Sequence, residues 1–260
     1  MNVQAVWVEI KKGLIRKIRS PVELITETLA AYVFLTVAIM AASGRAVTSG
    51  DAADELLFSL ACVFFCMGAL QGVVRIVTEE PGSGVVEQLS SSSIPLWRIA
   101  LIRDIASLAN FLPNIAVIIL AVSLTTGARM PPPKLSALVP LILMRLGMLG
   151  IGYVLGGIAL LAKRIGGLVN LISMGLFAVA FVPVDAKKGL VAAVSRFLPY
   201  GGCYYMAREI TFGGVGLGEF VAGGDLASAA ILAGVYFALG VFAFNKAFEA
   251  ALDGGFLGKS

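Results

Sequence analysis

The chain has 260 residues, of which 58% are hydrophobic and only 14% are charged, and its mean hydropathy is +0.93. Ordinary soluble domains are about 25% charged, so this composition excludes a soluble globular protein. The net charge of +4 does not indicate a nucleic-acid partner, because the basic residues lie beside apolar stretches, where they set orientation and meet anionic lipid headgroups. The lack of histidine removes the commonest metal ligand and proton shuttle.

The first 20 residues are predicted to form an amphipathic helix on the membrane surface. Its apolar residues recur at steps of three and four, and its basic residues fall mostly elsewhere around the helix, which is typical of interfacial helices. The apolar positions are Val3, Trp7, Ile10, Leu14 and Ile18, and the basic ones are Lys11, Lys12, Arg16, Lys17 and Arg19. Pro21 ends this helix. A signal peptide cleaved near Ala42 is the competing interpretation, but the apolar stretch is longer than the about 7 to 15 residues usual there.

Apolar residues after Pro21 come in blocks of roughly 20, the length that crosses about 30 Å of hydrocarbon as an α-helix. Helices are required, since a non-helical segment would leave backbone N–H and C=O groups unpaired in lipid. The sequence therefore predicts an all-α integral membrane protein, with one transmembrane domain over residues 21–260. Its six predicted spans are 22–42, 56–77, 95–125, 135–161, 165–184 and 226–248.

Prolines and glycines interrupt two parts of this pattern. Pro113 is expected to kink the third span where a neighbouring helix can cover the freed carbonyl. The segment 189–220 is moderately apolar but is broken by Pro199 and several glycines, so it is not predicted to span. Two motifs of small residues, Gly68-x-x-x-Gly72 and Gly152-x-x-x-Gly156, are interpreted as sites where helices approach closely.

The distribution of lysine and arginine sets the predicted orientation. With the N-terminus inside, the cytoplasmic segments hold twelve of these residues and the outer segments hold seven. Both termini are therefore expected in the cytoplasm, and the chain is expected in the plasma membrane. Arg145 remains inside the fourth span, where a cation is costly unless it is paired or hydrated. It could line a substrate path, pair with Asp104 or Glu27, or extend toward the interface.

Two other features could suggest chemistry but do not. Cys62 and Cys66 lie four apart inside an apolar span, so they are interpreted as small packing residues and not as a redox or metal pair. The C-terminal run from Gly254 to Ser260 has some likeness to a phosphate-binding loop. Asp253 stands where that pattern needs a glycine, so nucleotide binding by this chain is not expected.

The loop from Thr78 to Leu89 follows the second span on the predicted cytoplasmic side. It begins with acidic residues and glycines and then predicts one short helix before a serine run and Pro95. An ordinary cytoplasmic loop would have a similar composition. A short helix that exposes Val85 and Leu89 is, however, well suited to docking into a groove on a partner.

The stretch from Glu79 to Pro95 resembles a loop of the ABC-2 type permeases, the membrane subunits of type V ABC exporters. In that family an acidic pair, a glycine and a Leu-Glu-Gln-Leu-like helix precede a serine and a proline. The short helix is the coupling helix, which inserts into the ATPase subunit. The resemblance assigns ATPase coupling to Glu79, Glu80, Gly84, Val85, Val86, Glu87, Gln88 and Leu89.

Two further segments are similar to the same family. The run from Phe197 to Arg208 resembles the family's Leu-Pro…Arg segment between the fifth and sixth spans. This implies two short re-entrant helices on the outer side, with Pro199, Tyr200 and Arg208 as their characteristic residues. Residues 244–258 resemble the family's basic tail, which ends in Gly-x-Leu-Gly.

The chain also departs from the family's pattern. Pro81 sits where the family usually has a charged residue, and Val85-Val86 replaces the usual Thr-Leu. The tail has Asp253 and few basic residues where family members often carry arginines. These departures concern the details of ATPase docking more than the family.

The resemblance implies the permease subunit of an ABC exporter, present as a homodimer. A separate ATPase subunit would bind ATP and Mg, so no cofactor, metal or catalytic residue is expected in this chain. The path walls would come from the first, second and fifth spans, whose aromatic residues favour an amphipathic or hydrophobic substrate such as a drug, natural product or lipid. The candidate pathway residues are Tyr32, Phe34, Phe58, Phe64, Phe65, Arg145, Phe177 and Phe181.

An ATP-independent secondary transporter or channel is the alternative. Such proteins place ionisable residues or broken helices near the bilayer centre, and Arg145 and Pro113 offer a limited version of this arrangement. A membrane enzyme is a third possibility. The spans lack histidine and clustered carboxylates, which leaves little for general acid or base catalysis.

Overall fold

The computed structural model describes residues 3–42, 51–79, 95–132, 134–162, 165–181 and 197–253. Every regular element within these ranges is a helix. The elements in chain order are α1 (Val3–Arg19), α2 (Pro21–Ala42), α3 (Asp51–Glu79), α5 (Leu96–Thr126), the short 3-10 helix η2 (Leu135–Ala137), α6 (Leu138–Ala162), α7 (Gly166–Phe181), α9 (Pro199–Thr211), α10 (Leu217–Ala222) and α11 (Asp225–Asp253). The prediction of an all-α chain is confirmed for the described residues.

A helix occupies each of the six predicted spans. Among the described residues, four helical segments are long and apolar enough to cross a membrane, namely Ala53–Thr78, Leu96–Thr126, Leu135–Ala162 and Asp225–Leu252. The apolar parts of α2 and α7, Ile25–Ala41 and Gly166–Ala178, are shorter. The helices are thus those of a membrane protein, with four candidate spans by length and composition.

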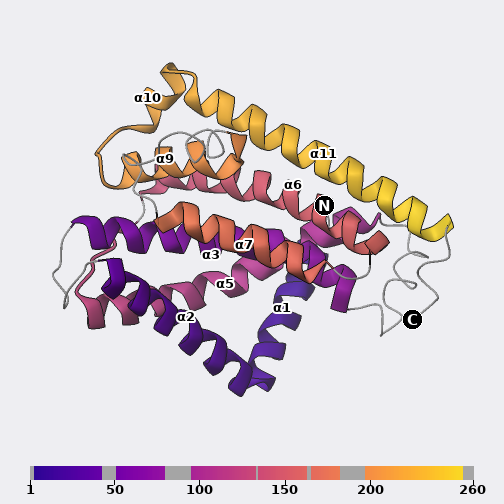
Figure 1. Ribbon diagram of the computed structural model, residues 1–260, viewed down its shortest axis with the longest axis horizontal. Coiled ribbons are helices and arrows are strands. Elements are labelled where there is room, and N and C mark those ends of the chain that lie inside the picture. Colours follow the sequence, from indigo (N-terminus) through magenta and orange to yellow (C-terminus); the bar gives the residue numbers. More distant parts are fainter. Residues whose placement is uncertain are drawn as a thin grey trace.

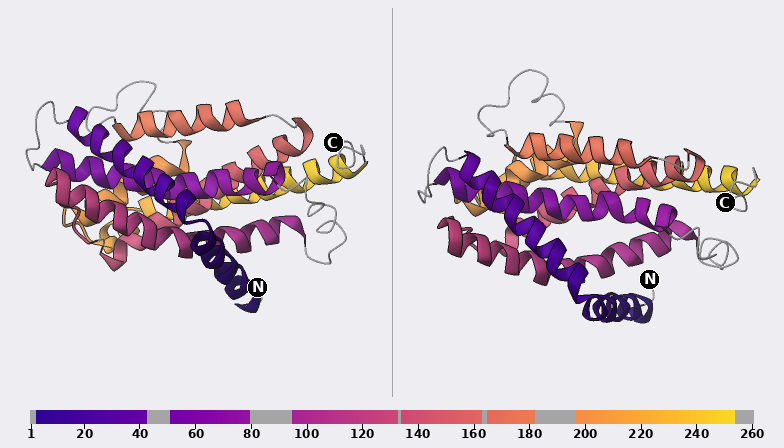
Figure 2. Two further views of the ribbon diagram at one scale, coloured as in Figure 1. Left: turned by 90° about the horizontal axis from the view of Figure 1, so that it is seen from below. Right: turned by 60° about the horizontal axis from the view of Figure 1, so that its bottom comes forward.

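Helix α6 lies at the centre of the bundle. It packs chiefly against α11 on one side and α3 on the other, and α9 covers its N-terminal half, as Figure 1 shows. Helix α5 packs against α1, α2 and α3. Figure 2 shows that α1 turns away from the bundle where α2 begins. Pro21 is the first residue of α2, and its missing N–H and fixed φ account for the break between the two helices.

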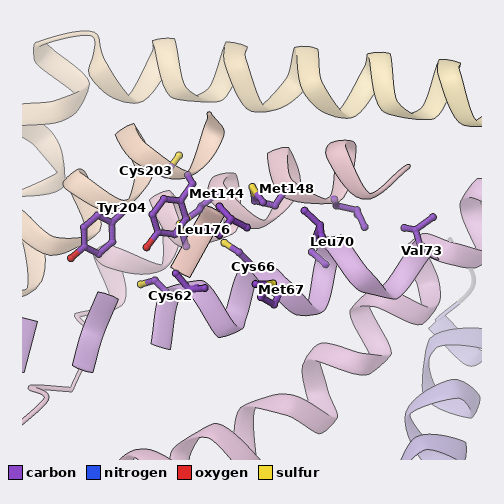
Figure 3. Packing of buried hydrophobic residues seen from close by; sticks show 14 of the residues in the cluster. Cys62, Cys66, Met67, Leu70, Val73, Met144, Met148, Leu176, Cys203 and Tyr204 are labelled. Carbon is purple, nitrogen blue, oxygen red and sulfur yellow. The ribbon is translucent and has the colours of Figure 1, made fainter. Parts of the chain in front are cut away.

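The core lies between α3, α6, α9 and α11. Cys62, Cys66, Met144 and Met148 are buried there with Leu70, as Figure 3 shows. The interpretation of Cys62 and Cys66 as packing residues agrees with this placement, since both thiols are free and buried.

Glycines determine how closely α6 approaches its neighbours. An added Cβ at Gly150 would collide with the backbone of Tyr236 on α11, and one at Gly240 would collide with the backbone of Gly150. At Gly152 an added Cβ would lie 2.9 Å from the carbonyl oxygen of Ala69 on α3. Gly156 is similarly crowded by a valine of α3 and a phenylalanine of α11. The packing role predicted for Gly152-x-x-x-Gly156 is confirmed.

The other small-residue motif, Gly68-x-x-x-Gly72, is not crowded by a neighbouring helix. An added Cβ at Gly72 would meet nothing within 4 Å, and one at Gly68 would meet only the guanidinium group of Arg145. The prediction that Gly68-x-x-x-Gly72 brings two helices together is therefore wrong for the described residues. That contact, at 3.6 Å, is an ordinary van der Waals distance.

Pro113 lies within one continuous helix, and Figure 2 shows α5 bent along its length. The helix ends at Gly127, whose φ of 75° is in the left-handed region that glycine adopts without strain. Before the last helix, the chain forms the two short helices α9 and α10. Pro199 is the first residue of α9, where its missing N–H costs no intrahelical hydrogen bond.

Candidate functional site

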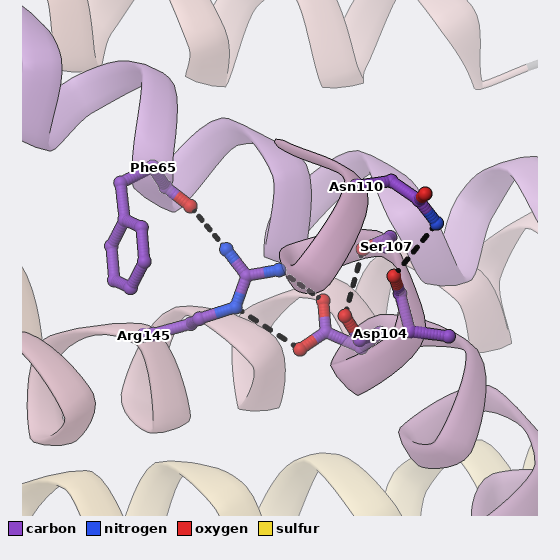
Figure 4. A network of polar contacts seen from close by, with 6 residues as sticks. Phe65, Asp104, Ser107, Asn110 and Arg145 are labelled. Carbon is purple, nitrogen blue, oxygen red and sulfur yellow. Dashed lines mark hydrogen bonds and ion pairs between the residues drawn. The ribbon is translucent and has the colours of Figure 1, made fainter. Parts of the chain in front are cut away.

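The most polar contact among the long apolar helices joins Arg145 of α6 to Asp104 of α5. Arg145 Nε donates to Asp104 Oδ2 at 3.1 Å, and Nη2 donates to Oδ1 at 2.6 Å. Both side chains are buried, and Figure 4 shows them facing each other across the two helices. This two-pronged geometry is the strongest form of an arginine–carboxylate contact. Of the alternatives open for Arg145, pairing with Asp104 is the one observed, whereas Glu27 is exposed on α2.

Helix α3 completes the surroundings of this ion pair. Arg145 Nη1 donates to the carbonyl oxygen of Phe65, and the guanidinium carbon lies 4.9 Å from the centre of the Phe65 ring. Gly68, almost one turn further along α3, lies beside the guanidinium group. Three helices therefore meet at one charged group. Its burial makes both partners necessary, because a lone charge there would be strongly destabilising.

A second polar link fixes the start of α5. The hydroxyl of Tyr153 on α6 donates to the carbonyl oxygen of Trp97 at 2.6 Å. The Tyr153 ring is fully buried and packs edge-on against Phe237 and Phe244 of α11. Neither Tyr153 nor Trp97 was among the predicted site residues. The available signal was a tyrosine inside an apolar stretch, whose hydroxyl needs a partner when it is buried.

Three of the predicted pathway residues come together at the junction of α2, α3 and α7. The rings of Phe34, Phe64 and Phe177 are in edge-on contact, with centroid distances of 6.2, 5.1 and 5.4 Å for the three pairs. Two turns along α3 from Phe64, the amide of Gln71 donates to the hydroxyl oxygen of Ser173 at 3.3 Å. The junction thus combines aromatic rings with an amide–hydroxyl pair. Sequence reasoning missed Gln71 and Ser173.

The remaining pathway residues lie elsewhere. Phe58 is buried and packs against Tyr204 and Phe212 near α9, apart from the three-ring group. Phe65 lies beside Arg145, and Tyr32 packs against the edge of the core. Phe181 is the last residue of α7, and its side chain lies outside the described part of the structure. The predicted residues therefore do not form one continuous wall within a single chain.

Helix α9 carries the residues predicted for the re-entrant segment. Tyr200 is buried, and its hydroxyl donates to the carbonyl oxygen of Ser59 on α3 at 3.4 Å. Arg208 forms ion pairs with Glu55 at 2.7 Å and Glu209 at 2.6 Å. Burial acts to lower the pKa of Arg208, but the hydrogen bond and charge of Glu55, together with the charge of Glu209, outweigh it and raise that pKa above its ordinary value. Arg208 thus stays charged and ties α9 to the start of α3.

The predicted ATPase-coupling residues begin at the end of α3. Glu79 is the last residue of α3. The others, Glu80, Gly84, Val85, Val86, Glu87, Gln88 and Leu89, lie outside the described residues.

Within the described ranges, no group of three or more histidine, cysteine, aspartate or glutamate residues is placed to hold a metal ion. Comparison of the sequence with protein-family models and with curated proteins gives no match. Any functional interpretation therefore depends on the residues themselves and on the arrangement of the helices.

Proposed function

We propose that this chain is the membrane-spanning subunit of an ABC exporter of the ABC-2 type. In this proposal, two copies enclose a path for an amphipathic or hydrophobic substrate, and separate ATPase subunits bind ATP and Mg. The six apolar helices cross the plasma membrane with both termini in the cytoplasm, and α9 and α10 enter the membrane from the outer side.

The observation that carries the proposal is the order of the helices. In the described part of the chain, an apolar pair, α2 and α3, precedes the segment 80–94. The apolar helices α5, α6 and α7 follow that segment, and the short helices α9 and α10 precede the long helix α11. This is the order that the resemblance of residues 79–95 and 197–208 to the ABC-2 family implies. The segment 80–94 is thus the part of the chain that we expect to contact the ATPase.

The contacts around α5 indicate how a movement of that segment would reach the bundle. Helix α5 begins just after the segment and is joined to α6 through Trp97 and Asp104. Arg145, the partner of Asp104, also binds the Phe65 carbonyl on α3, the helix that leads into the segment. Closure of the ATPase subunits would therefore move α3, α5 and α6 together, as a rigid body, and open the path outward.

The three-ring group of Phe34, Phe64 and Phe177 supports the proposed substrate class. Aromatic faces bind flat apolar groups, and the nearby Gln71–Ser173 pair offers a hydrogen-bond donor and acceptor. A molecule with an apolar body and a polar head would match both. A bare ion would find too few oxygen ligands there.

The proposal is tested on the full chain, purified from its native membrane in mild detergent. We expect Mg-dependent ATP hydrolysis to co-purify with it, and membrane vesicles to accumulate a fluorescent amphipathic dye when ATP is added. Glu87→Lys or Leu89→Lys should reduce both by about tenfold or more, since a misplaced charge in a docking contact costs several kcal/mol. The matched control is Glu249→Lys, which reverses the same charge at an exposed position on α11. Full ATPase association in the Glu87→Lys protein would contradict the coupling role.

A secondary transporter is the second candidate, favoured by the buried Arg145–Asp104 pair. Ionisable groups inside membrane spans often belong to ion or substrate paths. The same purified chain, reconstituted alone in liposomes, discriminates the two functions. Dye flux without ATP and without an ATPase subunit would favour the secondary transporter.

A further inference from the structure

The net charge of the chain is concentrated at its N-terminus. Residues 1–20 contain five basic residues and one acidic residue, which gives four positive charges, equal to the net charge of the whole chain. The other 240 residues contain fifteen basic and fifteen acidic residues and are neutral overall. The net positive charge of the chain is therefore equal to that of α1.

Helix α1 is held against α5 on one side. Gly13 faces the side chain of Asn110, and an added Cβ at Gly13 would collide with that amide. Because α1 packs mainly on α5, the opposite side of α1 is turned away from the bundle, as Figure 2 shows.

The side turned away presents a stripe of four exposed residues at steps of four, namely Trp7, Lys11, Ile15 and Arg19. Trp7 is 66% exposed and Ile15 is 41% exposed. Apolar and basic residues alternate along the stripe, which is about 18 Å long at the rise of an α-helix. We call these four residues the α1 stripe.

The two cations of the α1 stripe are available to a partner. Lys12, beside the stripe, is paired with Glu9 at 3.2 Å. Lys11 and Arg19, by contrast, make no ion pair within the described residues. In the α1 stripe, tryptophan and isoleucine alternate with unpaired cations. This pattern suits the boundary between lipid acyl chains and headgroup phosphates. Tryptophan is enriched at that boundary, and long basic side chains reach the phosphates from it.

We propose that the α1 stripe binds anionic lipid, with Lys11 and Arg19 on headgroup phosphates and Trp7 and Ile15 at the acyl boundary. The inference requires only that the chain resides in a membrane and does not rest on the exporter function. Each basic side chain near an anionic surface contributes a factor of roughly five to binding. The stripe should therefore enrich anionic lipid beside α1 over neutral lipid.

Trp7 itself reports on this binding. The chain has two tryptophans, so replacing Trp97 leaves Trp7 as the single tryptophan, whose fluorescence can be excited apart from that of the tyrosines. Trp97→Phe keeps the backbone carbonyl that Tyr153 binds, and Trp97→Tyr is the substitute if that variant is unstable. The full chain is placed in nanodiscs that contain phosphatidylcholine and phosphatidylglycerol, with bromine on the acyl chains of only one lipid. We expect brominated phosphatidylglycerol to quench Trp7 several-fold more strongly than brominated phosphatidylcholine at equal mole fraction.

Charge removal and salt give the matched controls. Lys11→Gln with Arg19→Gln should abolish the difference between the two lipids, and so should high ionic strength, because salt screens exposed charges. Lys134→Gln, which removes an exposed cation outside α1, should leave the difference unchanged. Equal quenching by both lipids in the parent protein would overturn the proposal. Absence of quenching by either lipid would also overturn it, since the stripe would then face protein or water.

Discussion

Arg145 shows what a charged side chain needs in order to lie inside a bundle of apolar helices. Its guanidinium group donates two hydrogen bonds to Asp104 and one to the Phe65 carbonyl oxygen, and it also lies near the Phe65 ring. The attraction within the pair offsets the cost of removing both charges from water only while both partners are present. Removing one partner alone should therefore lower the free energy of unfolding strongly.

We expect either Asp104→Leu or Arg145→Met to lower the free energy of unfolding by about 3–5 kcal/mol, because each leaves one buried charge without a partner. The double variant should lose less than either single variant, since it removes both charges together. Unfolding midpoints in detergent, measured for the four proteins of this cycle, provide the test. The exposed Lys246–Glu249 pair is the control, and Lys246→Gln should change stability by less than about 0.5 kcal/mol. If instead the double variant lost as much as the two single variants added together, the charges would not interact.

At the scale of single elements, close approach of α6 and α11 depends on Gly150 and Gly240. We expect Gly150→Ala to destabilise the protein by about 1–3 kcal/mol, because the new methyl group meets backbone atoms, which cannot move aside as a side chain can. Gly72→Ala is the matched variant, since the space beside Gly72 is open. It should be neutral or stabilising by up to about 1 kcal/mol, because alanine favours helix more than glycine does. Comparable destabilisation by both substitutions would contradict the packing role of Gly150.

The sequence pattern predicts helices well and their partners poorly. Hydropathy and Pro21 placed the ends of the described apolar helices within about five residues, because those signals are local to each helix. The pairing of Arg145 with Asp104, and the crowding of Gly150, depend on which helix lies opposite, which no pattern within one helix specifies. The Gly-x-x-x-Gly rule found Gly152 but missed Gly150 and Gly240, because neither has a second glycine four residues away on its own helix.

For the whole molecule, the exposed surface of the long helices is apolar. Only 17% of the most apolar window of α5, and of that of α11, is buried within the chain, and α11 presents Ile231, Leu239 and Phe242 outward, each at least 60% exposed. Such surfaces are expected to face acyl chains or another apolar helix. The orientation of these helices in the membrane is a further property of the whole chain, and it can be tested by labelling.

A membrane-impermeant maleimide should report that orientation in intact cells. The three native cysteines are buried, so the unmodified protein should label weakly. We expect Lys134→Cys to label from outside, and Arg98→Cys to label only after the cells are opened, because the proposed orientation places these exposed positions on opposite sides of the membrane. Labelling of Arg98→Cys in intact cells would show that the orientation is opposite to the proposed one.

The ion pair between α5 and α6 also has a consequence for how the chain is made. Asp104 and Arg145 are 41 residues apart, so a ribosome that adds about 5–20 residues per second completes Arg145 some seconds after Asp104. During that interval the third apolar helix carries a carboxylate without its cation, which disfavours its entry into lipid. We therefore expect α5 to wait at the insertion machinery until α6 emerges and the two helices enter the bilayer together as one hairpin.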